Sequence, residues 1–250
     1  MSPPQRPVLV LVGPPGSGKT TVGRMLARRL GVGFTDVDAL IVERIGKPIA
    51  AMFTDEGEDA FRALEREVVA EALVTAEGVL ALGGGSVLAA ATRERLRGHR
   101  VVLLWVGLAD GVRRTGLSAA RPLLAGVNPR ATFKALLDAR APLYREVATV
   151  EVDTSRRTTG QVTRAVLLEV ARVHPGVVDD AVVAAARSAP ADGVPGSPGA
   201  AERADDRRDP GGVDDADDGE GGAGPGAVDR GDRSLPPAVL LPDPFVRRRP

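Results

Sequence analysis

One eight-residue motif constrains the fold of this chain more than any other feature. It reads Gly13-Pro14-Pro15-Gly16-Ser17-Gly18-Lys19-Thr20 and fits the pattern G-x-x-x-x-G-K-[ST] at every fixed position. The motif follows the apolar run Val8–Val12, typical of a strand buried on both faces, and leads into a helical pattern over Thr20–Leu30. Glycines in such a turn let backbone N–H groups approach an anion. We therefore predict a phosphate-binding loop, with Lys19 on the β- and γ-phosphates of a nucleotide and the Thr20 hydroxyl on Mg²⁺.

Short apolar runs alternate with longer helical patterns through residues 1–175. The expected strands are Val8–Val12, Val32–Val37, Val79–Leu82, Val101–Val106 and Thr149–Val152. The expected helices are Thr20–Leu30, Thr54–Ala76 with Thr54 as its N-cap, Thr92–Arg97, Asp110–Thr115, Thr132–Ala139 and Gly160–Val173. Strand–helix alternation predicts right-handed crossovers and an α/β fold, in which helices cover both faces of a parallel sheet.

The formal net charge of zero is the sum of two unlike parts. Residues 1–175 carry 24 basic and 18 acidic side chains, whereas residues 176–250 carry 9 and 15. The second part also holds 12 Gly and 10 Pro, and beyond a short helical pattern at Val177–Ala189 it shows no periodicity. We expect one folded domain over residues 1–175 and a disordered, low-complexity acidic tail over residues 176–250, with unknown partners.

Composition excludes several classes of protein. Without cysteine there is no disulfide scaffold, thiolate zinc site, iron–sulfur cluster or thiol nucleophile. Apolar runs such as Val101–Val106 are far shorter than the roughly 20 residues that span a bilayer, and Val8–Val12 is too short for a signal-peptide core. We therefore expect a cytoplasmic protein with no membrane partner. Scattered arginines and only five Phe, one Tyr and one Trp also argue against a nucleic-acid partner.

Two carboxylates end the second expected strand. Asp36 and Asp38 are two residues apart, so in an extended chain they share a face and point into one cleft, at the edge where the phosphate loop lies. In this interpretation Asp36 holds the water shell of Mg²⁺, and Asp38 orients or deprotonates an acceptor hydroxyl. The alternative is a solvated pair that caps the next helix.

Three glycines and four arginines are further candidates. Gly83, Gly84 and Gly85 follow a strand and either expose bare backbone to a ligand or form a flexible turn. Arg62 has Glu58 and Glu65 at i−4 and i+3, which equally suit a surface ion pair. The other arginines are Arg121 in an aperiodic segment that suits a lid over the γ-phosphate, Arg140 just past a helix, and Arg157 after the last strand. A surface position is the alternative for each.

Together these motifs resemble those of the shikimate kinase family. The resemblance covers Val8 to Val173 and rests on the phosphate loop, Phe34-x-Asp36-x-Asp38, Phe61-Arg62, Gly83-Gly84-Gly85, Arg121-Pro122-Leu123-Leu124 and Arg140-Ala141-Pro142-Leu143-Tyr144. It implies a three-layer P-loop fold like that of nucleoside-monophosphate kinases, with a five-stranded parallel sheet. It also implies a monomer that uses Mg²⁺ and transfers the γ-phosphoryl group of ATP to the 3-hydroxyl of shikimate.

The resemblance also implies a role for each matching residue. The ATP-binding residues would be Gly16, Ser17, Gly18, Lys19, Thr20, Thr21, Arg114, Arg121 and Arg157, of which Arg114 and Arg157 flank the adenine. The metal-binding residues would be Thr20 and Asp36. The substrate-binding residues would be Asp38, Phe53, Phe61, Arg62, Gly83, Gly84, Gly85 and Arg140, with Arg62 and Arg140 on the substrate carboxylate. The catalytic residues would be Lys19, Asp38 and Arg121.

Two positions depart from the family pattern. Ala81 stands where relatives often carry a small hydroxyl residue near the metal, and Thr159 where some have a proline against adenine.

Two alternative functions remain. One is a kinase of another small hydroxylated acid, such as gluconate. The other is a non-catalytic nucleotide-binding module, which would be expected to have lost Lys19, Asp38 or Arg121.

Overall fold

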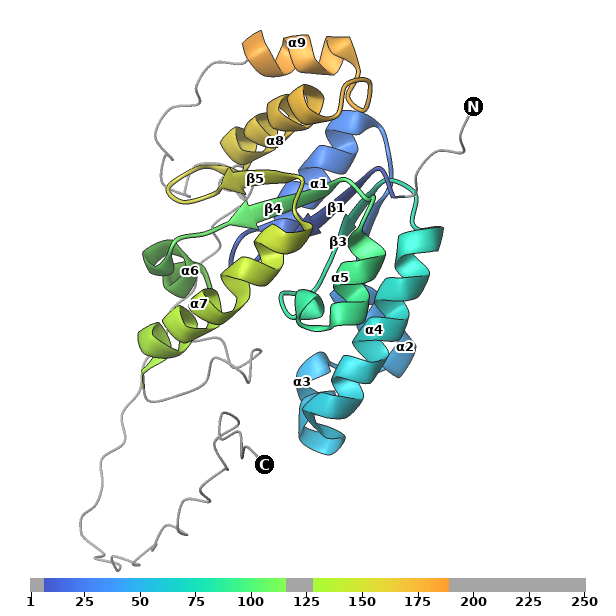
Figure 1. Ribbon diagram of the computed structural model, residues 1–250, viewed down its shortest axis with the longest axis vertical. Coiled ribbons are helices and arrows are strands. Elements are labelled where there is room, and N and C mark those ends of the chain that lie inside the picture. Colours follow the sequence, from blue (N-terminus) through green and yellow to red (C-terminus); the bar gives the residue numbers. More distant parts are fainter. Residues whose placement is uncertain (1–6, 116–127, 189–250) are drawn as a thin grey trace, which may run out of the picture. The chain divides into compact units, whose positions relative to one another are not determined.

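The computed structural model describes residues 7–115 and 128–188, and within them five parallel strands form one sheet in the order β2-β3-β1-β4-β5 (Figure 1). The strands are β1 (Leu9–Val12), β2 (Phe34–Asp36), β3 (Val79–Ala81), β4 (Val101–Trp105) and β5 (Val150–Asp153). This confirms the predicted five-stranded parallel sheet. In the central strand, Leu11 pairs with Ala81 on one side and Val102 on the other. The carboxyl end of β1 is therefore the switch point at which folds of this kind bind ligands.

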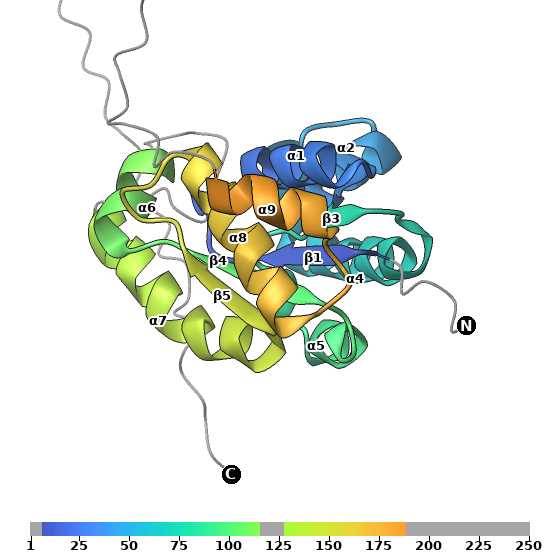
Figure 2. The same cartoon turned by 90° about the horizontal axis from the view of Figure 1, so that it is seen from above.

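Helices cover both faces of the sheet and complete the three predicted layers (Figure 2). They are α1 (Lys19–Leu30), α2 (Val37–Ile45), α3 (Ile49–Asp55), α4 (Gly57–Thr75), the 3₁₀ turn η1 (Ser86–Leu88), α5 (Ala90–Leu96), α6 (Leu108–Thr115), α7 (Pro129–Val147), α8 (Thr159–Val173) and α9 (Asp180–Ser188). The side chains of β1 alternate: Leu9 and Leu11 pack with α1, α8 and α9, whereas Val10 and Val12 pack with α2, α4, α5 and α7. Among the described residues, no helix is long and apolar enough to cross a membrane.

The predicted start of the long helix is wrong. Thr54 is not an N-cap; it lies inside α3, where its Oγ1 donates to the carbonyl oxygen of Ala50 at 3.1 Å. The chain then turns through Gly57, whose φ of 86° is a left-handed conformation that favours glycine, and α4 begins there. The short helices α2 and α3 were also missed.

The helix α7 is longer than predicted. It begins after Asn128, whose side chain accepts from the Ala131 N–H at 3.0 Å, and it continues through Pro142 to Val147. Proline interrupts the hydrogen bonding of a helix, but Tyr144 on the next turn is fully buried in the core and holds the helix in place. As a result Arg140 lies inside α7 and not past its end, as the sequence pattern had indicated.

The chain continues to fold beyond Pro175. The helix α8 begins with a capping box between Thr158 and Gln161, and α9 packs against it through the buried side chains of Val183 and Ala186. Helical structure therefore reaches Ser188, inside the segment expected to be tail. Residues 189–250 lie outside the described residues, so the disorder expected there stays a prediction.

Candidate active site

The phosphate loop connects β1 to α1 and depends on its glycines. Gly13, Gly16 and Gly18 have φ values of 147°, 77° and 89°, and a Cβ atom at Gly13 would collide with the carbonyl oxygen of Leu104. Gly18 is the N-cap of α1, and no side chain of the described residues caps it. The first N–H groups of α1 therefore suit an anion bound at the loop. Ser17 is buried and Thr21 is exposed, and the ATP contacts expected of them stay predictions.

Lys19 lies over the same loop. Its Nζ donates to the carbonyl oxygens of Gly13 at 2.8 Å and Pro14 at 3.2 Å. These contacts hold the ammonium group at the phosphate loop. The contact of Lys19 with phosphate oxygens stays a prediction.

Thr20, Asp36 and Asp38 form a hydrogen-bonded chain at the start of α1 and α2. Thr20 Oγ1 donates to Asp36 Oδ2 at 2.7 Å, and Asp36 Oδ1 accepts from the Asp38 N–H at 3.0 Å. The predicted reason for the proximity of the two carboxylates is wrong, because β2 ends at Asp36 and α2 begins at Val37. Asp36 is the N-cap of α2, as the alternative interpretation held, and it contacts Thr20 as well. Hydroxyl and carboxylate oxygens are the ligands that Mg²⁺ prefers, so Thr20 and Asp36 suit the ion.

Asp38 shares the space beside Gly83 with a second carboxylate. A Cβ atom at Gly83 would lie 2.8 Å from Asp38 Oδ1 and 2.6 Å from Glu65 Oε1, so only glycine admits both groups. Glu65 is 3% exposed, accepts from Ser86 Oγ at 2.7 Å and pairs with Arg62 Nη1 at 2.6 Å. The i+3 spacing predicts a surface pair of Arg62 and Glu65, but Glu65 also lies four residues after Phe61, on the inward face of α4, and this second spacing favours burial.

Arg62 is held against the triple glycine and a pair of aromatic rings. Its guanidinium contacts Glu58 as well as Glu65, and a Cβ atom at Gly85 would collide with it. Its Cζ lies 5.2 Å from the Phe61 ring centroid, and the Phe53 and Phe61 centroids are 4.6 Å apart. Phe53, Phe61 and Arg62 therefore lie together, and the Arg62 side chain is 17% exposed.

Arg140 reaches the middle glycine from α7. Its Nη1 donates to the Gly84 carbonyl oxygen at 3.1 Å, and the Tyr144 hydroxyl donates to the same oxygen. Burial raises the pKa of Tyr144 to about 12 although the charge of Arg140 opposes this, so the hydroxyl remains a donor at neutral pH. Pro15 of the phosphate loop packs on Gly84, since a Cβ atom there would lie 3.2 Å from Pro15 Cδ. The triple glycine therefore contacts both the phosphate loop and Arg140.

Arg114 and Arg157 lie on the other side of the phosphate loop, at the β5–α8 loop (residues 154–158). The guanidinium of Arg114 donates to Thr154 Oγ1 at 3.1 Å and to the Thr154 carbonyl oxygen at 2.7 Å. Burial raises the pKa of Asp153, but hydrogen bonds from Ser155 and the positive charges of Arg157 and Arg156 outweigh it and hold that pKa below its usual range. Arg121 lies outside the described residues, and its predicted role as a lid arginine stays a prediction.

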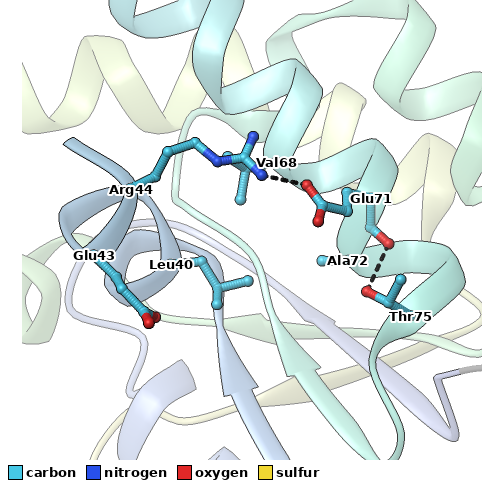
Figure 3. Close-up of a pocket in the computed structure, with 7 residues that line it drawn as sticks. All are labelled: Leu40, Glu43, Arg44, Val68, Glu71, Ala72 and Thr75. Atoms are coloured by element: carbon cyan, nitrogen blue, oxygen red, sulfur yellow. Dashed lines mark hydrogen bonds and ion pairs between the residues drawn. The ribbon is translucent and has the colours of Figure 1, made fainter.

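A separate groove of about 320 Å³ lies between α2 and α4 (Figure 3). Its lining residues are Leu40, Glu43, Arg44, Val68, Glu71, Ala72 and Thr75. The Arg44 guanidinium pairs with Glu71 across it, as the dashed line in Figure 3 shows. No residue predicted for the active site lines this groove, so we place the chemistry at the phosphate loop.

A chain with a phosphate-loop motif at the end of β1, and with a carboxylate and two guanidinium groups beside the neighbouring triple glycine, can position a phosphoryl group for transfer. Its fold and site define the class of P-loop kinases. A family model described as Shikimate kinase matches residues 15–171. The chain belongs to the shikimate kinase family, as its motifs implied.

The relatives cover the folded part of the chain. A shikimate kinase from Saccharopolyspora erythraea is 67% identical over 148 residues, which are 59% of this chain and 85% of the relative. One from Salinispora tropica is 60% identical over 169 residues, which are 68% of this chain and 98% of the relative. The solved structure of a shikimate kinase from Acinetobacter baumannii in complex with shikimate is 38% identical, with a TM-score of 0.65, and the match covers 67% of this chain and 94% of that one.

Proposed function

We propose that this chain transfers the γ-phosphoryl group of ATP to the 3-hydroxyl of shikimate, giving shikimate 3-phosphate and ADP. The observation that carries the proposal is the convergence on the triple glycine: Asp38 approaches Gly83, Arg140 donates to Gly84, and Arg62 lies against Gly85. Relatives named shikimate kinase support the choice of acceptor. Bidentate guanidinium groups suit the carboxylate of such an acceptor, and Asp38 suits its hydroxyl.

The phosphate side supports in-line transfer. A loose phosphoryl-transfer transition state needs positioning and charge neutralisation more than covalent chemistry, and Lys19 with the N-terminus of α1 supplies both at the γ-phosphate. Asp38 orients the acceptor hydroxyl and takes its proton as the new O–P bond forms and the bond to ADP breaks. Thr20 and Asp36 would hold Mg²⁺, which neutralises charge on the β- and γ-phosphates when bound. Within the described residues no three acidic, His or Cys side chains cluster as metal ligands.

We expect the enzyme to act as a monomer in the cytoplasm. Among the described residues, those assigned to the acceptor converge on the triple glycine within one chain, and this supports a monomer. ATP is the phosphoryl donor of the cytoplasm, and this supports the location.

A coupled ADP-release assay with MgATP tests the proposed function. Shikimate should give turnover well above the rate without acceptor, and gluconate should give none and should not compete. Turnover with gluconate alone would support the rival small-acid kinase. Nucleotide binding without turnover on any acceptor would support a non-catalytic module.

Replacing Glu65 with glutamine should raise the KM for shikimate about 10- to 100-fold and leave the KM for ATP within about twofold. The change keeps the shape but removes the buried charge that orients Arg62, and hydrogen bonds to charged groups contribute about 1.5–3 kcal/mol. Glu58→Gln is the matched control, because Glu58 is 47% exposed and contacts the same guanidinium. Glu58→Gln should raise the KM for shikimate a few-fold at most. Equal effects of the two variants in steady-state kinetics would contradict a special role for Glu65.

Truncation after Ala189 should leave kcat and the melting temperature unchanged, whereas truncation after Pro175 should destabilise the enzyme by about 3–5 kcal/mol. The shorter chain loses Val178, Val183 and Ala186, which are buried against α8, and uncovers the apolar face of that helix. Thermal unfolding and the kinase assay on both truncated chains check this. Similar melting temperatures of the two truncated chains would show that α9 does not stabilise the domain. Loss of activity in the chain truncated after Ala189 would show that residues 190–250 contribute to catalysis.

A further inference from the structure

Asp110 is a buried carboxylate that the proposed mechanism does not use. It lies in the first turn of α6 and is 6% exposed. Its Oδ2 accepts from the backbone N–H of Arg156 at 2.7 Å, and its Oδ1 pairs with the exposed Arg113 at 2.6 Å. A buried carboxylate is costly unless hydrogen-bonded, so the bond to Arg156 is central to its environment.

Arg156 has the backbone conformation that most needs such a bond. Its φ is 52°, and no other non-glycine residue among those described has a positive φ. The left-handed conformation is unfavourable for residues with a Cβ atom and persists only where the surroundings fix it. Asp110 accepts a hydrogen bond at this residue, so it stabilises the observed shape of the β5–α8 loop.

The same helix holds this loop at two more points and also contacts the phosphate loop. The Gly107 N–H, just before α6, donates to Ser155 Oγ at 2.9 Å, and Arg114 donates twice to Thr154. A Cβ atom at Gly16 would lie 3.2 Å from the Gly111 carbonyl oxygen, so α6 packs directly against the phosphate loop. In Figure 1, α6 lies beyond the carboxyl end of β4.

We infer that Asp110 is a positioning residue for the nucleotide base: by fixing Arg156, it sets the β5–α8 loop at its place beside the phosphate loop. The inference rests on the proposed function. The acceptor residues Asp38 and Gly83 lie on the β2–β3 side of the phosphate loop, so the β4–β5 side is left for the base of ATP. The β5–α8 loop, which Asp110 holds in place, follows β5, the edge strand on that side of the sheet.

Titration of nucleotide binding in the full-length enzyme tests this without an acceptor. Trp105 is the only tryptophan of the chain, and its carbonyl oxygen accepts from the Thr154 N–H at 2.8 Å, so its fluorescence reports on this loop. Asp110→Ala should raise the Kd for MgADP about tenfold, and the KM for ATP likewise, with the KM for shikimate within about twofold. Asp110→Asn keeps an oxygen acceptor for the Arg156 N–H and should stay within about threefold. Arg113→Gln, which removes only the exposed ion pair, should also change little.

A second pair of variants tests the same loop with Asp110 intact. Arg156→Val and Arg156→Gly both remove the guanidinium, but only valine opposes a positive φ. Valine should weaken MgADP binding about tenfold relative to glycine, and Arg156→Gly should restore binding to Asp110→Ala at least in part. Equal affinities of the valine and glycine variants, or an Asp110→Ala enzyme in which both KM values rise together without rescue, would overturn the inference. Failure of shikimate turnover in the wild-type enzyme would overturn the proposed function instead, because MgADP binding needs no acceptor.

Discussion

Replacing Asp38 with asparagine is expected to lower kcat by about 10²–10⁴-fold while the Kd for MgATP stays within a few-fold of wild type. The amide has the size of the carboxylate, so it still fits beside Gly83, where Asp38 Oδ1 lies 2.8 Å from the position of a Cβ atom. It cannot accept the proton of the acceptor hydroxyl. ATP binding depends mainly on the phosphate loop, which the substitution does not touch.

An aspartate-to-asparagine change at an exposed position is the control for Asp38→Asn. Asp138→Asn removes an exposed carboxylate that pairs only with Lys134 at 2.6 Å among the contacts described for it, and it should leave kcat unchanged. Rapid-quench measurements of the transfer step would separate chemistry from product release. An Asp38→Asn enzyme with near-wild-type kcat would refute the role of Asp38 in orienting or deprotonating the acceptor.

Replacing Lys19 with methionine should lower kcat/KM for ATP by about 10²–10³-fold, as expected when one preorganised donor to the transferring phosphoryl group is lost. Methionine keeps an unbranched chain but removes the ammonium group that donates to Gly13 and Pro14. Lys134→Met, on the exposed face of α7, is the matched control and should have no measurable effect.

The melting temperature separates catalysis from loop stability at Lys19. The bonds from Lys19 to the loop carbonyls are ordinary in length, and their loss should cost only about 1–2 kcal/mol of folding free energy. A Lys19→Met enzyme within tenfold of wild type in kcat/KM would exclude the proposed charge contact. A large fall in melting temperature with proportionate loss of activity would indicate a structural role.

The sheet and the phosphate loop could be predicted because their signals are local. The run Val8–Val12 is apolar at every position, and the glycines of the motif mark the turn and the start of α1. The strand β5 also has a local signal, the alternation typical of a half-buried strand: Val150 and Val152 face the core and Glu151 faces outward. Such strands can be recognised from their own residues, without knowing which helices pack on them.

The predictions that were wrong concern features that depend on contacts between segments far apart in the sequence. Periodicity does not reveal that α2 follows β2 directly, and so Asp38 was assigned to a strand when it belongs to the first turn of a helix. The helix expected to end at Ala139 continues through Pro142 because Tyr144 is buried, and Arg140 on this helix reaches Gly84. Glu65 is buried because Ser86 and Arg62 satisfy its carboxylate, and only Arg62 could be expected from spacing, since Ser86 lies 21 positions later in the chain.

The double hydrogen bond at the Gly84 carbonyl oxygen has a consequence for engineering acceptor specificity. Most of the residues assigned to the acceptor lie between Phe34 and Leu88, a stretch that invites exchange with that of a relative. Arg140 and Tyr144, however, reach Gly84 from α7, more than fifty positions later in the chain. A chimaera that replaces residues 34–88 alone must therefore present a backbone carbonyl at the same point, or the grafted segment will lose the two donors that anchor it to the host.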